Sequence, residues 1–302
     1  MTKLLFLKLA LVAVLGSITA SATPLPLDIA YLALGEQGFW QVWITDREGI
    51  TQRQITHSRF DKSSLSWYPG GQNLLVNGVQ GELVKVNVPT GKEQHFSHDL
   101  PDFFDAVLSH NGQFIVFSLR TSETTDDNNI WLMNERELHG SAPIAPQRLV
   151  SMAGLQHEPR WTPDDEWIYF LSGDGGEHHD IWRLEMASGD REQLTVNNLY
   201  HFDVAVSPDN QCVFSGNSTG DYQLWLLKKS GQREQLTFAE GLDAHPSWSP
   251  LSDSMVFQSS RGGVANIWHL ELSSRNFTQI TQHAGGARKP VWYLGKQQGG
   301  AR

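Results

Sequence analysis

A short element built around tryptophan recurs along the chain at nearly even intervals. An aliphatic residue precedes the tryptophan in each copy, and the copies are Val42-Trp43, Ile130-Trp131, Ile181-Trp182, Leu224-Trp225 and Ile267-Trp268. Leu83-Val84 fills the remaining position, with valine in place of tryptophan. From residue 43 through residues 84, 131, 182 and 225 to residue 268, the spacings are 41, 47, 51, 43 and 43 residues. A repeat of this period indicates an array of equivalent structural units.

Each unit also carries a marker for the end of a strand. Residues 161–165 (Trp-Thr-Pro-Asp-Asp) and 206–210 (Val-Ser-Pro-Asp-Asn) place proline and turn residues directly after a large apolar residue. Proline cannot continue a β-ladder, and Asp and Asn tolerate the dihedral angles of a turn. In most units an alternating strand follows, then the tryptophan strand, then a strand ending in Gln-Leu-Thr or Gln-Ile-Thr. Four strands in about 40 to 50 residues make a propeller blade, so we expect an all-β, six-bladed β-propeller of four-stranded blades.

The last blade is predicted to form from both ends of the chain. Residues 29–34, 41–45 and 52–56 supply the second, third and fourth strands of one unit, and residues 290–294 supply a lone first strand. Pairing the two ends removes free sheet edges. We therefore expect residues 23–302 to form a single propeller domain, closed by the C-terminal strand plus the N-terminal strands, with the tryptophan rings packed between neighbouring blades.

The repeat resembles the WD40-like PD40 repeat of the TolB propeller family. Residues 245–250 (His-Pro-Ser-Trp-Ser-Pro) and 158–163 (Glu-Pro-Arg-Trp-Thr-Pro) carry the resemblance most clearly, and it covers nearly all of residues 23–302. The resemblance implies a propeller fold and a role in protein binding, since TolB docks the peptidoglycan-associated lipoprotein Pal. Residues 23–28 alone precede the first expected strand, so the N-terminal α/β domain of TolB and its contact with TolA are not carried over. The repeat is specific for architecture and not for function.

Residues 1–22 are predicted to be a cleaved secretory signal. Lys3 and Lys8 flank and enter an apolar run from Leu4 to Leu15, and residues 20–22 (Ala-Ser-Ala) offer the small side chains that signal cleavage near Ala22 requires. The apolar run is shorter than the roughly 20 residues that span a bilayer. We therefore expect an exported, periplasmic protein with no transmembrane segment after cleavage.

Charge and cysteine content exclude several classes of function. Removing Lys3 and Lys8 with the signal lowers Lys plus Arg from 23 to 21 against 33 acidic residues, a net charge of 21 − 33 = −12. A chain this acidic is not expected to bind nucleic acid or an anionic membrane surface. Cys212 is the only cysteine, which excludes an intramolecular disulfide. Its place on the apolar side of a strand predicts an inert core thiol.

Aligning the units places six residues at one equivalent position, three residues before each strand-end marker. These ring residues are Ser64, Asp105, Glu158, Asp203, His245 and Lys289. The innermost strands of a propeller surround its channel, so the ring is expected at the channel mouth, where three consecutive carboxylates could hold a cation or a basic side chain of a partner. His157, His201 and Arg288 lie close to ring residues in sequence and complete the predicted binding site. The alternative is an ordinary polar mouth filled with water.

Two further motifs fit turns better than active sites. Residues 216–220 match the Gly-x-Ser-x-Gly pattern of hydrolases, but that nucleophile needs a strand running into a helix, and here the pattern joins two strands of one blade. Asp174, Glu177, His178, His179 and Asp180 have the residue types of a metal site. Neighbouring strand residues point to opposite faces, so the two histidines converge only if the loop bends sharply. No catalytic residue, metal or cofactor is predicted.

These observations favour a periplasmic interaction or scaffold module over a self-contained enzyme. The expected partner is an envelope protein or peptide, which includes a lipoprotein. The alternative is a metal-dependent enzyme at the channel mouth, similar to polysaccharide lyases on related propellers. It requires His245 with Glu158, or with His157 and His201, around one ion.

Overall fold

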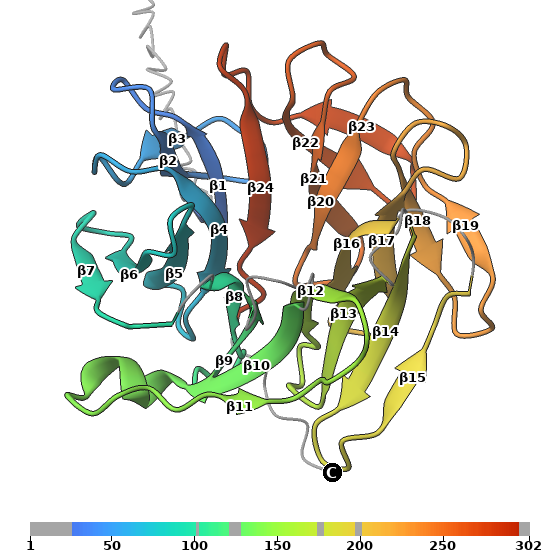
Figure 1. The fold of residues 1–302 in the computed structure, drawn as a ribbon. Coiled ribbons are helices and arrows are strands. Elements are labelled where there is room, and N and C mark those ends of the chain that lie inside the picture. The colour runs from blue at the N-terminus through green and yellow to red at the C-terminus, as the bar shows by residue number, and fades with distance from the viewer. Residues whose placement is uncertain (1–25, 101–102, 121–127, 174–177, 197–200, 296–302) are drawn as a thin grey trace, which may run out of the picture.

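The computed structural model describes residues 26–100, 103–120, 128–173, 178–196 and 201–295. Within them, six four-stranded antiparallel sheets are arranged in a ring as the blades of a β-propeller (Figure 1). The predicted signal at residues 1–22 lies outside the described residues. The fold class predicted from the repeat is confirmed.

Each blade runs outward from an inner strand at the channel. Blade 1 contains β24 (Ala287–Trp292), β1 (Ile29–Leu34), β2 (Trp40–Thr45) and β3 (Gln52–Gln54). Blade 2 contains β4 (Lys62–Trp67), β5 (Asn73–Gly78), β6 (Leu83–Asn87) and β7 (Glu93–Phe96). Blade 3 contains β8 (Phe103–Leu108), β9 (Phe114–Arg120), β10 (Asn128–Asn134) and β11 (Gln147–Arg148).

The remaining blades repeat this order. Blade 4 contains β12 (Leu155–Trp161), β13 (Trp167–Gly173), β14 (His179–Glu185) and β15 (Arg191–Gln193). Blade 5 contains β16 (His201–Val206), β17 (Cys212–Gly216), β18 (Gln223–Leu227) and β19 (Arg233–Gln235). Blade 6 contains β20 (Asp243–Trp248), β21 (Ser254–Ser259), β22 (Asn266–Glu271) and β23 (Asn276–Gln279).

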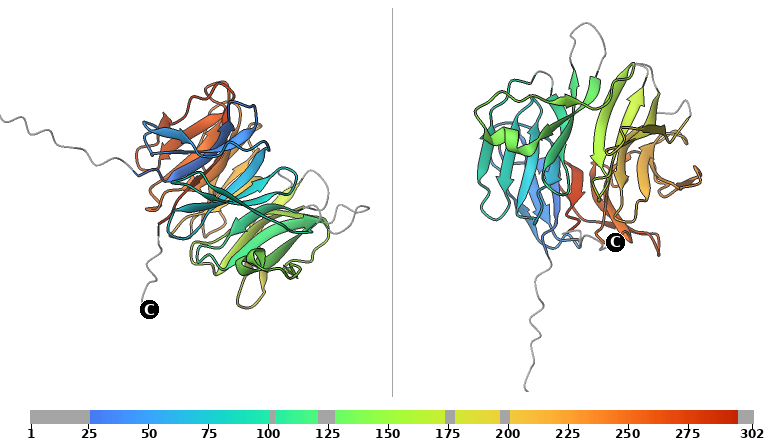
Figure 2. Two further views of the ribbon diagram at one scale, coloured as in Figure 1. Left: turned by 90° about the vertical axis from the view of Figure 1, so that its left-hand side faces the viewer. Right: turned by 90° about the horizontal axis from the view of Figure 1, so that it is seen from below.

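The chain closes on itself in blade 1, as predicted. β24 pairs antiparallel with β1, and Ile29 lies opposite Trp292 in the register. Figure 1 shows β24, in red, beside the blue N-terminal strand β1, and the views in Figure 2 show the same sheet from two other sides. The pairing covers the inner edge of β1, which would otherwise be free to pair with another chain.

The hydrophobic core is divided among the blade interfaces. Six clusters of buried residues each join two adjacent sheets of the described chain, and one of them joins Leu32 and Val42 of blade 1 to Leu74 and Val84 of blade 2. This division follows from strands buried on both faces, because each sheet packs against two neighbours. The blades are therefore held side by side mainly by apolar packing.

Tryptophans at the ends of three inner strands tie blades 2, 4 and 6 to the blade before each of them. The indole N–H of Trp67 donates to Val291 O at 3.1 Å, and Trp161 donates to Val107 O at 3.2 Å. Trp248 donates to the carbonyl of the preceding inner strand in the same way. The tryptophans of the third strands are half-buried, and each packs against a core cluster between two blades, as expected.

The insertion between β10 and β11 contains a 3-10 helix, η1 (Glu135–His139). Asn134 and Glu137 form its capping box, and Leu138 joins the core between blades 2 and 3. The Tyr68 hydroxyl donates to Glu135 Oε1 at 2.9 Å, which fixes the helix to blade 2. The insertion is therefore anchored to the body of the propeller.

Cys212 is a buried core thiol, as predicted. It lies at the start of β17 within the cluster between blades 4 and 5. Burial raises the pKa of the thiol to about 12, against a smaller opposing effect of Arg183. Because the thiolate is the reactive form, Cys212 is unreactive at neutral pH.

Candidate functional site

The ring residues share an unusual backbone conformation. Each lies near the start of an inner strand, where the pairing with the second strand shifts register. Five of the six have positive φ: Asp105 (55°), Glu158 (52°), Asp203 (57°), His245 (50°) and Lys289 (50°). Positive φ is uncommon outside glycine, and a β-bulge redirects the side chain next to it. Five blades thus carry the same bulge at the channel.

Charged side chains of the ring contact one another across the blade interfaces. The backbone N–H of His245 donates to Asp203 Oδ2 at 3.0 Å, and the ring nitrogen Nδ1 of His245 lies 2.7 Å from Asp203 Oδ1. The Asp105 carboxylate accepts from the backbone N–H of Glu158 in the same manner. Glu158 forms an ion pair with Arg160. Ring carboxylates therefore accept hydrogen bonds from backbone N–H groups at the bulges and pair with basic side chains near the channel.

Burial and neighbouring charges shift the pKa values of two ring carboxyl groups in opposite directions. Burial and the charge of Glu158 raise the pKa of Asp105 to about 7, against the opposing charges of Lys289 and Arg160. For Glu158, burial favours the neutral acid, but Arg160, Lys289 and His245 together hold the pKa well below its usual range. One site of the ring thus exchanges a proton near neutral pH while its neighbour stays ionised.

Three predicted site residues that flank the ring have other surroundings. His157 Nε2 lies 3.0 Å from His179 Nδ1, with the ring centroids 4.6 Å apart. His201 has no exposed surface and packs on Phe214, and burial together with Arg233 and His179 lowers its pKa to about 4.

Arg288, the third of these residues, turns toward blade 2. Its guanidinium lies 3.8 Å from the ring centroid of Trp40 and donates to Lys62 O at 3.3 Å. His201 and Arg288 are therefore held among other side chains of the propeller, whereas the ring residues face one another at the channel.

The metal-ion sets required by the enzyme alternative are not assembled. His245 contacts Asp203, Glu158 contacts Arg160 and His157 contacts His179. Among the described residues, no three His, Cys, Asp or Glu side chains are arranged to hold a metal ion.

The other two sequence motifs lie in loops and strand ends. Asp174 and Glu177 are outside the described residues, and His178 is exposed while His179 is buried, as neighbouring strand residues should be. Residues 216–220 form the predicted turn between β17 and β18, and the Gly220 N–H donates to Asn217 O at 3.0 Å. This geometry belongs to a blade turn and not to a hydrolase nucleophile.

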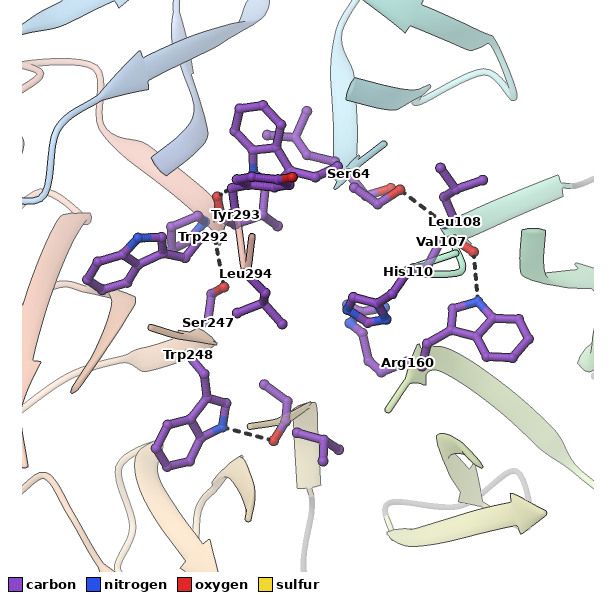
Figure 3. A pocket seen from close by; sticks show the side chains of 18 of the residues that line it. Ser64, Val107, Leu108, His110, Arg160, Ser247, Trp248, Trp292, Tyr293 and Leu294 are labelled. Atoms are coloured by element: carbon purple, nitrogen blue, oxygen red, sulfur yellow. Dashed lines mark hydrogen bonds between the residues drawn. The ribbon is translucent and has the colours of Figure 1, made fainter. Parts of the chain in front are cut away.

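Sequence reasoning missed Arg160 and the cavity beside it. Arg160 lies two residues after Glu158 on β12, but the register shift between His157 and Arg160 breaks the alternation of the strand, so sequence spacing gave no signal for their ion pair. Below the ring, a cavity of about 180 Å³ extends along the channel toward Tyr293 and Leu294. Figure 3 shows Ser64, Arg160 and Leu294 around this open space.

Exposed apolar side chains gather at the end of the channel nearest the ring, here called the ring end. The antiparallel pairing places the loops between second and third strands, and those between blades, at this end. Of the six large exposed hydrophobic residues in the described chain, four lie in such loops: Val79, Val196, Phe238 and Val264. Ile50 and Leu251 lie in turns at the opposite end. The ring end therefore combines a charged centre with apolar loops.

Comparison with known proteins assigns the architecture to a family. The profile of the family described as the TolB beta propeller domain (PD40) matches residues 121–294. The chain belongs to the TolB β-propeller family. The Tol-Pal system protein TolB of Gluconobacter oxydans is 31% identical over 173 residues, which cover 55% of this chain and 36% of that protein. The TolB-family chain described here thus spans about a third of that relative's length.

Solved structures share the fold of this TolB-family chain. TolB from Acinetobacter baumannii matches with a TM-score of 0.74 and 19% identity over 87% of this chain and 66% of that one. An oligogalacturonate lyase from Vibrio parahaemolyticus matches with a TM-score of 0.53 and 16% identity over 79% and 75% of the two chains. Because a Tol-Pal system protein and a lyase share this architecture, function has to be argued from the site.

Proposed function

We propose that this TolB-family propeller is a periplasmic interaction module that binds another protein of the cell envelope at the ring end of its channel. The observation that carries the proposal is the ring itself. Five blades hold a charged residue or histidine at φ between 50° and 57° at the same position.

The cost of this backbone conformation points to a use for the side chains. A non-glycine residue with left-handed φ is strained by about 1–3 kcal/mol, and glycine would adopt the same conformation without strain. The chain contains 27 glycines but has none at the five positions. Strain of this kind, repeated at one level of a channel, supports a binding role in which the charged groups are needed.

The surroundings of the ring suit a protein partner. Protein interfaces combine an apolar contact area with polar groups that set orientation. Phe238 is 75% exposed and Val264 is 53% exposed, in loops of neighbouring sectors at the ring end. A partner that covers these loops can direct a basic side chain toward Asp105 and Glu158.

A periplasmic location and an envelope partner are parts of the same proposal. Residues 1–22 have the pattern of a secretory signal, and a Tol-Pal system protein is among the relatives. In the described part of the chain, no helix has the length and apolar character needed to cross a membrane. An envelope lipoprotein is the partner class that we expect first.

The proposal predicts that apolar loops at the ring end carry partner binding. The immobilised protein is incubated with a detergent extract of the source cell's envelope, and retained proteins are identified by mass spectrometry. The double variant F238S/V264S should retain the partner at least tenfold less than the wild type, because each change removes exposed apolar area from the proposed contact.

The matched control is the double variant I50S/L251S, which changes two residues exposed to 79% and 80% at the opposite end. It should retain the partner as the wild type does. Equal loss in both variants, or no protein retained above a bare matrix, would overturn the proposal.

A further inference from the structure

The cavity on the other side of the ring has the size of a small-molecule site. Its volume is about 180 Å³, and apolar side chains from several inner strands line it, including Leu65, Val107 and Val291. An apolar cavity of about 150 Å³ is known to accept benzene. The space therefore suits one aromatic ring or a short alkyl chain.

Basic side chains dominate the end of the cavity that meets the ring. Arg160, His245 and Lys289 line it, and Asp203 is the only carboxylate among the described lining residues. Asp203 is occupied by His245, whose Nδ1 lies 2.7 Å away. The charges at the ring are therefore divided along the channel. Arg160 and Lys289 line the cavity, whereas Asp105 and Glu158 do not.

Two of the lining residues have polar groups without a protein partner. The Lys289 charge acts on the nearby carboxyl groups of Asp105 and Glu158, but among the described residues its ammonium has no hydrogen-bond or ion-pair partner within 4.0 Å. Ser64 Oγ is buried and also lacks a hydrogen-bond partner there. The two residues hold equivalent positions on β24 and β4, which are adjacent inner strands. An unsatisfied buried donor such as the Ser64 hydroxyl costs about 1–3 kcal/mol. A ligand that accepts from this hydroxyl and from the half-buried Lys289 ammonium would therefore be stabilised.

We propose that this cavity binds a small carboxylate with an apolar body. The carboxylate accepts hydrogen bonds from the Lys289 ammonium and the Ser64 hydroxyl, and the apolar body packs against Leu65, Val107 and Val291. A carboxylate matches the charge of the lining and the two open donors. This site shares Ser64 and Lys289 with the ring but lies on the side of the ring away from the apolar loops of the proposed protein contact, toward Leu294.

Binding can be measured on the full chain by isothermal titration calorimetry with hexanoate and 3-phenylpropanoate. We expect saturable binding with one site per chain, competition between the two acids, and at least tenfold weaker binding of 1-hexanol and 3-phenylpropanamide. The uncharged analogues keep the apolar body but cannot accept a charge-assisted hydrogen bond.

Variants locate the site and keep the test independent of folding. Lys289→Met should weaken the binding of both acids at least tenfold, whereas Lys92→Met, a change at an exposed lysine of blade 2, should leave it unchanged. Ser64→Ala removes a hydroxyl without a hydrogen-bond partner, so it should weaken binding several-fold without lowering the melting temperature. Leu294→Trp should block binding by filling the mouth of the cavity while Lys289 is kept.

Short peptides distinguish two sources of the same chemistry. Peptides that end in leucine with a free carboxylate are compared with their C-terminal amides, and both are compared with the free acids. Binding of the free acids alone assigns the site to small metabolite-like acids, and binding of the carboxylate peptides assigns it to a chain terminus.

Three results would overturn the proposal: no binding of either acid at millimolar concentration, equal binding of the amides, or unchanged binding in Lys289→Met. Failure to retain any envelope protein would overturn the proposed function and leave these binding results unaffected, so failure of one proposal is distinguishable from failure of the other.

Discussion

Asp105 shows how a single residue couples the backbone of this propeller to its charge. Its bulge conformation at φ 55° brings the carboxyl group to the backbone N–H of Glu158 in the next blade. That position also brings it near the Glu158 carboxylate, so burial and like charge raise its pKa to about 7. Lys289 and Arg160 face the same group and oppose the shift. The residue therefore links the protonation of the ring to the stability of the fold.

The shift predicts how stability should depend on pH. Between the unfolded pKa of about 3.9 and the native value, the native state keeps a proton that the unfolded chain has released. This contribution therefore stabilises the protein fully below about pH 4 and is lost as pH rises through about 7. Asp105→Asn keeps an acceptor for the Glu158 amide but cannot titrate. Thermal melts from acid to neutral pH should show the variant gaining stability relative to the wild type.

The comparison with wild type is needed because other groups titrate in the same pH range. Burial lowers the pKa of His201 to about 4, and a histidine of this kind adds stability that is lost as pH falls. Asp190→Asn, at an exposed aspartate after β14, serves as the control and should track the wild type. A difference between Asp105→Asn and wild type that stays constant with pH would contradict the assignment.

At the scale of elements, the turns between first and second strands tie blades together. Asp165 in the turn after β12 reaches the corresponding turn of blade 3, where its carboxylate accepts the N–H of His110 at 2.7 Å and that of Asn111 at 2.8 Å. These contacts complement the indole bonds between inner strands. Neighbouring blades are thus linked by polar contacts as well as by apolar packing.

Asp165→Asn should destabilise the protein by about 1–3 kcal/mol, because the amide can accept only one of the two N–H groups and leaves the other unpaired. Asparagine tolerates the φ of 58° at this position, so backbone strain is not added. Equilibrium unfolding in urea measures the change, with Asp190→Asn again as the control. An unchanged midpoint would mean that water replaces the contact without loss.

At the scale of the whole molecule, stability depends on closure of the ring. β24 supplies the inner strand of blade 1, and Trp292 and Ala287 belong to the core shared with blade 6. Without it, the described blades would form an open array with an exposed edge at β1. Exposed edges promote association with other chains.

A chain ending after Gly286 should therefore lose cooperative unfolding and aggregate at concentrations where the full chain stays monodisperse. Urea denaturation and size-exclusion chromatography measure the two effects. A chain ending after Gly295 keeps β24 and is the matched control. A cooperative transition at the wild-type midpoint in the shorter chain would show that closure is dispensable.

The sequence by itself determined the architecture, the number of blades and the place of the ring residues. Each repeat carries its own turn residues and strand pattern, so local chemistry defines the blade, and the lone C-terminal strand identifies the closure. The alignment of repeats also found Asp105, Glu158 and His245 at one level of the channel, because equivalent strands in a propeller occupy equivalent places.

Only the tertiary structure decided where the side chains near the ring point. A bulge breaks the two-residue alternation of a strand, so the burial of His201 and the turn of Arg288 toward Trp40 could not be read from spacing. The cavity and its open donors arise where six inner strands meet, and Ser64 and Lys289 are neighbours there despite a separation of 289 − 64 = 225 residues. The sequence pattern predicts closure of the ring, but not which side chains of distant strands meet once the ring has closed.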